Sequence, residues 1–285
     1  MIKKKGKVML FALLGVLLAV SAGCGKTQQA ASEPAGNGSQ KVKVAYVTYY
    51  VPYDYQNSQG KADGMEVAVI KEVAKRNPSW DIQMIPTSDE DLLVGLEAGK
   101  YDIGIKGIWK TPERQKKFLF PEHYSAASVV GLVFRTEDSG KIHSLEDFGK
   151  TGGRLVPISP QSAQYTVISD FNKNHPEEQI QLNAADTFQS NDAYTWILEG
   201  RYDGYFDLEK LFQENVTSEK GPYHPFAGRL SFVRYRAIPT YPMFYKKRQD
   251  LVRDYDRALS QMMSDGTYRK LEQTYFGEDI TRLVQ

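Results

Sequence analysis

Two similar segments each end in a charged side chain that could bind a small polar ligand. Residues 99–114 read G-K-Y-D-I-G-I-K-G-I-W-K-T-P-E-R, and residues 200–207 read G-R-Y-D-G-Y-F-D. The first ends on Arg114, whose planar guanidinium can hold both oxygens of a carboxylate. The second ends on Asp207, whose carboxylate can pair with an ammonium group. We therefore hypothesise that a zwitterion is held between Arg114 and Asp207.

The residues around these two segments predict the same local structure twice. Apolar runs at 92–96 and 196–198 precede Gly99 and Gly200 with the pattern of amphipathic helices. A glycine directly after such a run is a common helix stop. A short apolar strand then follows each glycine, so the charged residues are expected beyond the ends of comparable strands.

The wider pattern predicts two α/β units in tandem. In the first, strands and helices alternate as strand 42–46, helix 65–73, strand 80–84, a helix capped by Ser88 and strand 101–105. In the second, the same order returns as strand 154–158, a helix from 162, strand 180–184, helix 191–199 and strand 202–206. Each βαβαβ unit is typical of a lobe with helices packed on a largely parallel sheet.

The tail predicts a discontinuous first lobe. Residues 237–245 look extended, and two helices follow to the end of the chain. We expect this tail to return to the first lobe, so that two strands cross between the lobes as a hinge. The predicted boundaries are 41–125 plus 238–285 for lobe 1 and 126–237 for lobe 2.

The N-terminus has the form of a lipoprotein export signal. Four lysines precede an apolar run at 8–20, which is short for a membrane-spanning helix, and Ser21-Ala22-Gly23-Cys24 follows. The small residues before this single cysteine resemble a bacterial lipobox. We expect a signal peptide at 1–23, lipidation of Cys24, a flexible tether at 24–40 and an extracytoplasmic, membrane-anchored protein. A stray cysteine in an ordinary export signal is the alternative.

Composition argues against several other classes of function. Removing the four leader lysines from 36 basic residues leaves 32 against 35 acidic residues, with the two signs interspersed. No nucleic-acid footprint is therefore expected. The four histidines have neither metal-ligand nor catalytic-triad spacing, so neither a metal nor a cofactor is expected. We expect a monomer.

Several motifs resemble one known family. Their order along the chain is P-Y-D-Y at 52–55, G-M-E at 64–66, L-E-A-G-K-Y-D at 96–102, T-P-E-R at 111–114 and D-G-T-Y at 265–268. These motifs resemble the bacterial family 3 extracellular solute-binding proteins, the amino-acid-binding proteins of ABC importers, and their polar amino acid and cystine branch. The resemblance implies a type II periplasmic-binding-protein fold, with two lobes joined by a two-strand hinge, that delivers an amino acid to a membrane permease.

The resemblance also implies roles for individual residues. Arg114 matches the arginine that binds the ligand carboxylate, and Asp207 the aspartate that binds the ammonium group. Gly107 matches a glycine whose backbone approaches the ligand, Tyr50 an aromatic wall and Ser162 a hydroxyl at a helix start. Structural alternatives stay open: a surface arginine paired with Glu113, a turn aspartate, a core tyrosine and a simple helix cap.

Three positions depart from the family pattern and bear on specificity. Trp109 replaces a small hydroxyl residue, Gln161 replaces a glycine, and Asp89 lies where many relatives have an aromatic residue. Together they would suit a longer ligand with its own polar end, and cystine or a related sulfur amino acid is the predicted ligand. Asp89 could instead serve the helix that follows Ser88.

Two functions of other classes are the alternatives to a binding protein. A cyclohexadienyl-dehydratase-like enzyme on the same fold would need a positioned proton donor in the cleft, and the scattered histidines do not suggest one. A ligand-sensing input subunit would need a separate signalling partner, because no signalling domain follows before Gln285. We expect a binding protein rather than an enzyme.

Overall fold

The computed structural model describes residues 39–160, 162–185 and 190–284. The predicted signal peptide, Cys24 with residues 24–38 of the tether, and Gln161 lie outside the described residues. Within the described ranges, no helix is both long and apolar enough to cross a membrane.

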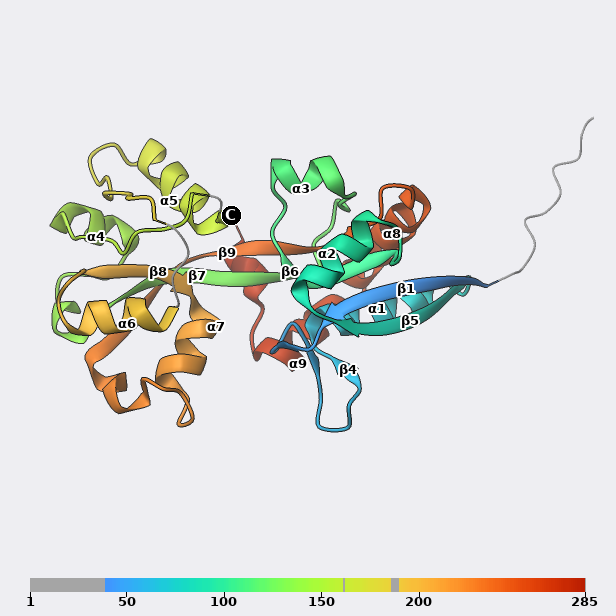
Figure 1. Ribbon diagram of the computed structural model, residues 1–285, viewed down its shortest axis with the longest axis horizontal. Helices are drawn as coiled ribbons and strands as arrows, with labels where there is room; N and C mark the ends of the chain where they lie inside the picture. Colours follow the sequence, from blue (N-terminus) through green and yellow to red (C-terminus); the bar gives the residue numbers. More distant parts are fainter. Residues whose placement is uncertain (1–38, 161, 186–189, 285) are drawn as a thin grey trace, which may run out of the picture. The chain divides into compact units, whose positions relative to one another are not determined.

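The fold is built on a six-stranded sheet in the order β5-β1-β6-β9-β7-β8 (Figure 1). Its strands are β1 (Gln40–Val47), β5 (Trp80–Thr87), β6 (Ile103–Ile108), β7 (Ala126–Arg135), β8 (Gly204–Leu208) and β9 (Leu230–Phe244). Strands β5, β1 and β6 run parallel, whereas β9 is antiparallel to both β6 and β7. A small antiparallel sheet joins β2 (Tyr49–Tyr50), β3 (Asp54–Gln56) and β4 (Ala62–Asp63).

Alternation along β1 separates the helices of the first half into two layers. Val42, Val44 and Tyr46 belong to a buried cluster with residues of α1 (Met65–Arg76), α8 (Gln249–Ser264) and α9 (Thr267–Phe276). Ala45 and Val47 belong to another cluster with residues of α2 (Asp89–Glu97). Successive strand residues point to opposite faces, so α1 and α2 cover opposite faces of β1 (Figure 1). The first α/β unit was predicted correctly, and both C-terminal helices pack on it.

The second half also has helices on two sides of its strands. Val130 and Leu132 of β7 belong to a buried cluster with α4 (Leu145–Thr151) and α5 (Ala163–Asn174). Val133, the residue after Leu132, belongs instead to a cluster with α6 (Ser190–Leu198) and α7 (Glu209–Phe212). The buried clusters of the two halves lie along the same β7–β9 ladder, which continues from Ala126–Thr240 to Arg135–Leu230.

Two predicted strands of the second half are reduced to single bridges. Leu155 pairs with Gly204 and Ile158 with Ala184, both in parallel, where continuous strands at 154–158 and 180–184 were expected. Pro157 lies between the two bridges and has no N–H to donate to a ladder. Strand β9 is longer than predicted, because it begins at Leu230 rather than 237. The exact lobe boundaries stay a prediction.

The repeated Gly-basic-Tyr-Asp motif, at residues 99–102 and 200–203, has a structural role in both copies. Gly99 and Gly200 follow α2 and α6 with φ angles of 75° and 72°, which glycine adopts readily. Asp102 accepts a hydrogen bond from the Lys43 backbone N at 2.8 Å and pairs with Arg248. Asp102 therefore connects the start of β6 to β1 and to Arg248.

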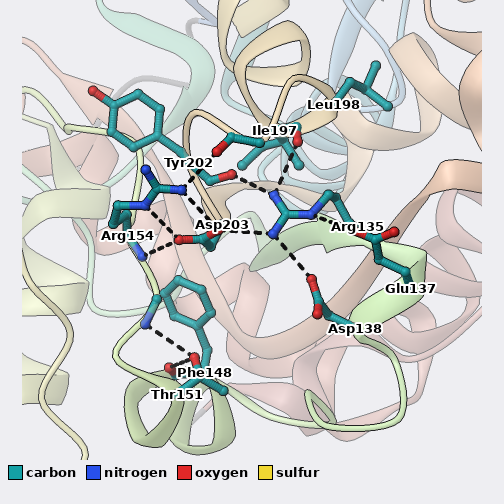
Figure 2. Close-up of polar contacts among 12 residues, drawn as sticks. Arg135, Glu137, Asp138, Phe148, Thr151, Arg154, Ile197, Leu198, Tyr202 and Asp203 are labelled. Atoms are coloured by element: carbon teal, nitrogen blue, oxygen red, sulfur yellow. Dashed lines mark hydrogen bonds and ion pairs between the residues drawn. The ribbon is translucent and has the colours of Figure 1, made fainter.

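In the second copy, Asp203 lies between two arginines. Figure 2 shows Arg135 and Arg154 approaching its carboxylate from opposite sides, with Nη2 of Arg135 and Nε of Arg154 each at 2.9 Å. Burial acts to raise the pKa of Asp203, but the hydrogen bonds from Arg154 and Arg135 outweigh it and lower the pKa to about 2. The carboxylate is thus stabilised as an anion in the fold.

We predict that Asp203→Asn destabilises the protein by about 1.5–3 kcal/mol at pH 7, the range for hydrogen bonds to charged groups. Because the folded-state pKa of Asp203 is depressed, the contribution of its carboxylate to the free energy of unfolding is fully present above about pH 4. It is lost as pH falls through about 2. Urea denaturation at pH 7 and pH 2.5 tests it, with the exposed Asp81→Asn as control. Equal stability of wild type and Asp203→Asn at pH 7 would contradict the prediction.

Candidate functional site

A cavity of about 1340 Å³ collects charged and aromatic side chains from both halves of the chain. It is larger than the roughly 300–1,000 Å³ of most small-molecule sites. Its walls come from the end of β6, the loop into α3 (Pro112–Lys117), the start of α5, Leu208 and the middle of β9. Five residues predicted to bind ligand line it: Tyr50, Gly107, Trp109, Arg114 and Ser162.

The start of α3 positions Arg114. Thr111 caps the helix by accepting a hydrogen bond from the Arg114 backbone N at 3.4 Å, and Pro112 occupies the first turn. The Arg114 guanidinium is half-buried, and its Nη1 donates to the Trp109 carbonyl oxygen at 2.7 Å. Burial lowers its pKa while Glu113 acts in the opposite sense, yet arginine remains a cation in proteins. Its other guanidinium nitrogens have no hydrogen-bond partner among the described residues, so they are available for an anion.

Trp109 is buried and belongs to the same apolar cluster as Val130, Leu132 and Val167 of the second half. Its indole thus connects the loop that carries Arg114 with the core around α5. A small residue at position 109 would remove that packing. Trp109 therefore contributes to the core as well as to the cavity wall.

Gly107 is held by a buried carboxylate. Its φ of 64° favours glycine, and a Cβ there would clash with the ring of Tyr50. Its N–H donates to Oε2 of Glu66 at 2.9 Å, while Oε1 of Glu66 accepts from the hydroxyls of Ser125 and Thr240 at 2.7 and 2.8 Å. Glu66 therefore fixes the cavity backbone to α1 and β9.

A second buried acid lies beside Glu66. Neither oxygen of the Asp54 carboxyl has a hydrogen-bond partner among the described residues. Burial, and next the nearby Glu66, raise the pKa of Asp54 well above its usual value. The raised pKa favours the neutral form of Asp54, which avoids a second anion beside Glu66.

The aromatic wall and the α5 start are also positioned by local contacts. The Tyr50 ring stacks on Tyr53, with centroids 4.6 Å apart and planes 15° apart. Ser162 caps α5 by accepting a hydrogen bond from the Tyr165 backbone N at 3.2 Å. Ser162 thus serves as a helix cap and also lines the cavity, and its contact with a ligand stays a prediction.

Asp207 is not among the residues that line the cavity. It is 1% exposed, and Oδ2 accepts a hydrogen bond from the Tyr194 hydroxyl at 2.7 Å while Oδ1 accepts from the Leu208 backbone N at 2.8 Å. Burial raises the pKa of Asp207 to about 6, although these hydrogen bonds act to lower it. The next residue, Leu208, does line the cavity. Ammonium binding by Asp207 stays a prediction.

Asp89 is likewise outside the cavity wall and is already paired. Its Oδ2 lies 2.5 Å from Nζ of Lys106, and its Oδ1 accepts a hydrogen bond from the Tyr49 hydroxyl at 2.8 Å. Lys106 itself lines the cavity. Asp89 is also the first residue of α2, which Ser88 caps through the Asp91 backbone N. Its nearest charged partner is a lysine of the protein.

The cavity is more cationic than the sequence suggested. Among its described lining residues Glu113 is the one carboxylate, against four cations: Lys106, Lys110, Arg114 and Arg236. Lys106 is paired with Asp89, while Nζ of Lys110 donates to the Pro121 carbonyl oxygen at 3.4 Å and lies 5.3 Å from the Tyr241 ring centroid. Lys106 and Lys110 lie within residues 99–114 but were not singled out, and Arg236 lies between Tyr235 and Ala237 without a recognisable motif. No cluster of potential metal ligands occurs in the described ranges.

Comparison with known proteins places this fold and cavity in a family. The bacterial extracellular solute-binding proteins, family 3, match residues 42–278. The L-cystine-binding proteins TcyJ and TcyK of Bacillus subtilis (strain 168) are 29% and 28% identical to the chain over 284 residues, covering 98% of it and 97% and 98% of their own lengths.

A solved structure extends the likeness to three dimensions. The probable amino-acid ABC transporter extracellular-binding protein ytmK from Bacillus subtilis is 25% identical, with a TM-score of 0.66, and the match covers 85% of this chain and 99% of that one. The family match spans both halves of the sheet and every described cavity residue, and the α/β fold is the two-lobed type II periplasmic-binding fold. The chain belongs to the bacterial extracellular solute-binding proteins, family 3.

Proposed function

We propose that this protein is the extracytoplasmic substrate-binding lipoprotein of an amino-acid ABC importer. It captures an amino acid between its two lobes and passes it to the membrane permease. The observation that carries the proposal is Arg114, a half-buried guanidinium with unused donors in a cavity walled by both halves of the chain. A carboxylate held by such a fork gains two charge-assisted hydrogen bonds in one orientation.

Ligand binding would favour closure of the lobes. Arg114 belongs to the first half, whereas Ser162 and Leu208, next to Asp207, line the cavity from the second half. A ligand that contacts both sides completes its interactions only when the two approach. Such a ligand shifts the population toward the closed form by its differential affinity.

Cystine is the proposed ligand, with related sulfur amino acids next. The names of TcyJ and TcyK, which match over nearly the whole chain, support this choice. So does the size of the cavity, which would accommodate a ligand with two polar ends. Trp109 offers it an apolar surface between those ends.

Isothermal titration of the ligand-free protein with the common amino acids and L-cystine tests this function. We expect saturable heat with cystine and weaker heat with amino acids that have short uncharged side chains. Tight binding of another amino acid with no heat from cystine would refute the ligand, and no binding of any amino acid would refute the function.

Membrane anchoring through Cys24 completes the proposal and is supported by the sequence alone. Incorporation of a labelled fatty acid into the wild-type chain, and its loss in Cys24→Ser, is the expected result. Labelling of both proteins would show that the lipid is attached elsewhere.

A further inference from the structure

Arg236 is a second guanidinium in the cavity. It lies on β9, and its Nε is buried without a hydrogen-bond partner among the described residues. Its guanidinium carbon is 5.6 Å from the centroid of the adjacent Tyr235 ring. Buried polar groups in proteins are nearly always hydrogen-bonded. The unpaired Nε of Arg236, on a residue that lines the cavity, could therefore donate a hydrogen bond to an acceptor group of a ligand.

A β-bulge directs Arg236 to this side of the sheet. Val130 of β7 pairs with Arg236, but the next residue, Gly131, pairs with Arg234, so Tyr235 is the extra residue. In a regular strand, Arg234 and Arg236 would share one face. Here Arg234 forms ion pairs with Glu209 at 2.8 Å and Glu278 at 2.7 Å, whereas Arg236 lines the cavity. Bulges are frequent next to binding sites because they re-aim a side chain.

Arg114 and Arg236 are the two guanidinium groups among the described lining residues of the cavity, and neither forms an ion pair with a described carboxylate. Asp89 neutralises Lys106, and Lys110 is occupied by the Pro121 carbonyl and the Tyr241 ring. One nitrogen of Arg114, Nη1, donates a hydrogen bond to the Trp109 carbonyl oxygen. Guanidinium groups are suited to carboxylates by their fixed fork of donors. The cavity therefore presents two separate positions for an anionic group.

We propose that Arg236 binds a second carboxylate of the ligand, so that the site selects amino acids that carry two carboxylate groups, one at Arg114 and one at Arg236. This inference rests on the proposed amino-acid binding. It assigns to Arg236 a part in specificity: an amino acid with one carboxylate leaves its buried Nε unpaired, whereas cystine satisfies both arginines.

The test compares two sulfur amino acids that differ in their number of carboxylates. L-Cystine has two and S-methyl-L-cysteine has one. Isothermal titration with wild type and Arg236→Gln is expected to show that the substitution weakens cystine binding at least about tenfold more than S-methyl-L-cysteine binding, as for loss of a charged partner. Arg236→Lys, which keeps the charge without the fork, should recover part of the loss. Arg234→Gln, on the same strand but paired with Glu209 and Glu278, is the matched control and should not alter the ratio of the two affinities.

The outcomes separate this inference from the function on which it rests. An equal loss for both ligands, or no loss, in Arg236→Gln overturns the role of Arg236 while amino-acid binding stands. Wild-type preference for amino acids with a single carboxylate does the same. If wild type binds no amino acid at all, the proposed function itself is wrong. Melting temperatures of the three variants establish that any loss is not caused by unfolding.

Discussion

Arg114→Gln should lose nearly all affinity for every amino acid that the protein binds. Removing one partner of a desolvated, hydrogen-bonded charge pair costs about 2–5 kcal/mol, and each 1.4 kcal/mol is tenfold, so the dissociation constant should rise roughly 30- to 4,000-fold. The fold should persist, because Arg114 is half-buried and one hydrogen bond, to the Trp109 carbonyl, ties its side chain to the protein. Titration calorimetry measures the affinity, and thermal unfolding checks the fold.

The exposed Arg253 on α8 provides the control for this experiment. Arg253→Gln removes the same charge from the molecule without touching the cavity, so it separates a local contact from a change in the overall field. Affinity should then stay at the wild-type level. If Arg114→Gln binds cystine as tightly as Arg253→Gln does, the ligand carboxylate is held elsewhere, with Arg236 the next position to examine.

Local sequence patterns predicted the elements near the site well. Helix caps at Ser88 and Ser162 depend on side-chain chemistry within a few residues, and such signals can be read directly from the chain. Gly107 and Arg114, singled out by the family resemblance, both line the cavity. Strand alternation also predicted β1, because its period is strictly local.

Contacts between segments that are distant in the sequence could not be predicted from local patterns. The bulge at Tyr235 depends on the register between β7 and β9, and without it the direction of Arg236 cannot be known. The pairing of Asp89 with Lys106 joins α2 to β6. The hydrogen bond from Tyr194 to Asp207 joins α6 to the end of β8. Asp89 and Asp207 were singled out for their charge, but tertiary structure determines the partner of each.

Ligand affinity should fall in acid if Asp207 binds the ammonium group. Burial raises the pKa of Asp207 to about 6 in the ligand-free protein, so the carboxyl is mostly ionised at pH 7 and mostly protonated at pH 5. A ligand ammonium needs the anion and must therefore displace a proton in acid. The dissociation constant should rise about tenfold between pH 7 and pH 5, and titrations across this range would measure it.

Asp207→Asn should both weaken binding and remove this pH dependence. The amide keeps the shape of the side chain and can still accept the hydrogen bond from Tyr194, but it carries no charge for the ammonium, so a loss of about 2–5 kcal/mol is expected at pH 7. The curve of affinity against pH should then be flat between pH 5 and 7. The exposed Asp81, which does not line the cavity, supplies the control: Asp81→Asn removes one carboxylate elsewhere and should retain the acid-dependent loss. A variant Asp207→Asn that binds as tightly as wild type and keeps the same pH profile would exclude Asp207 from the site and leave its buried carboxyl as a structural partner of Tyr194.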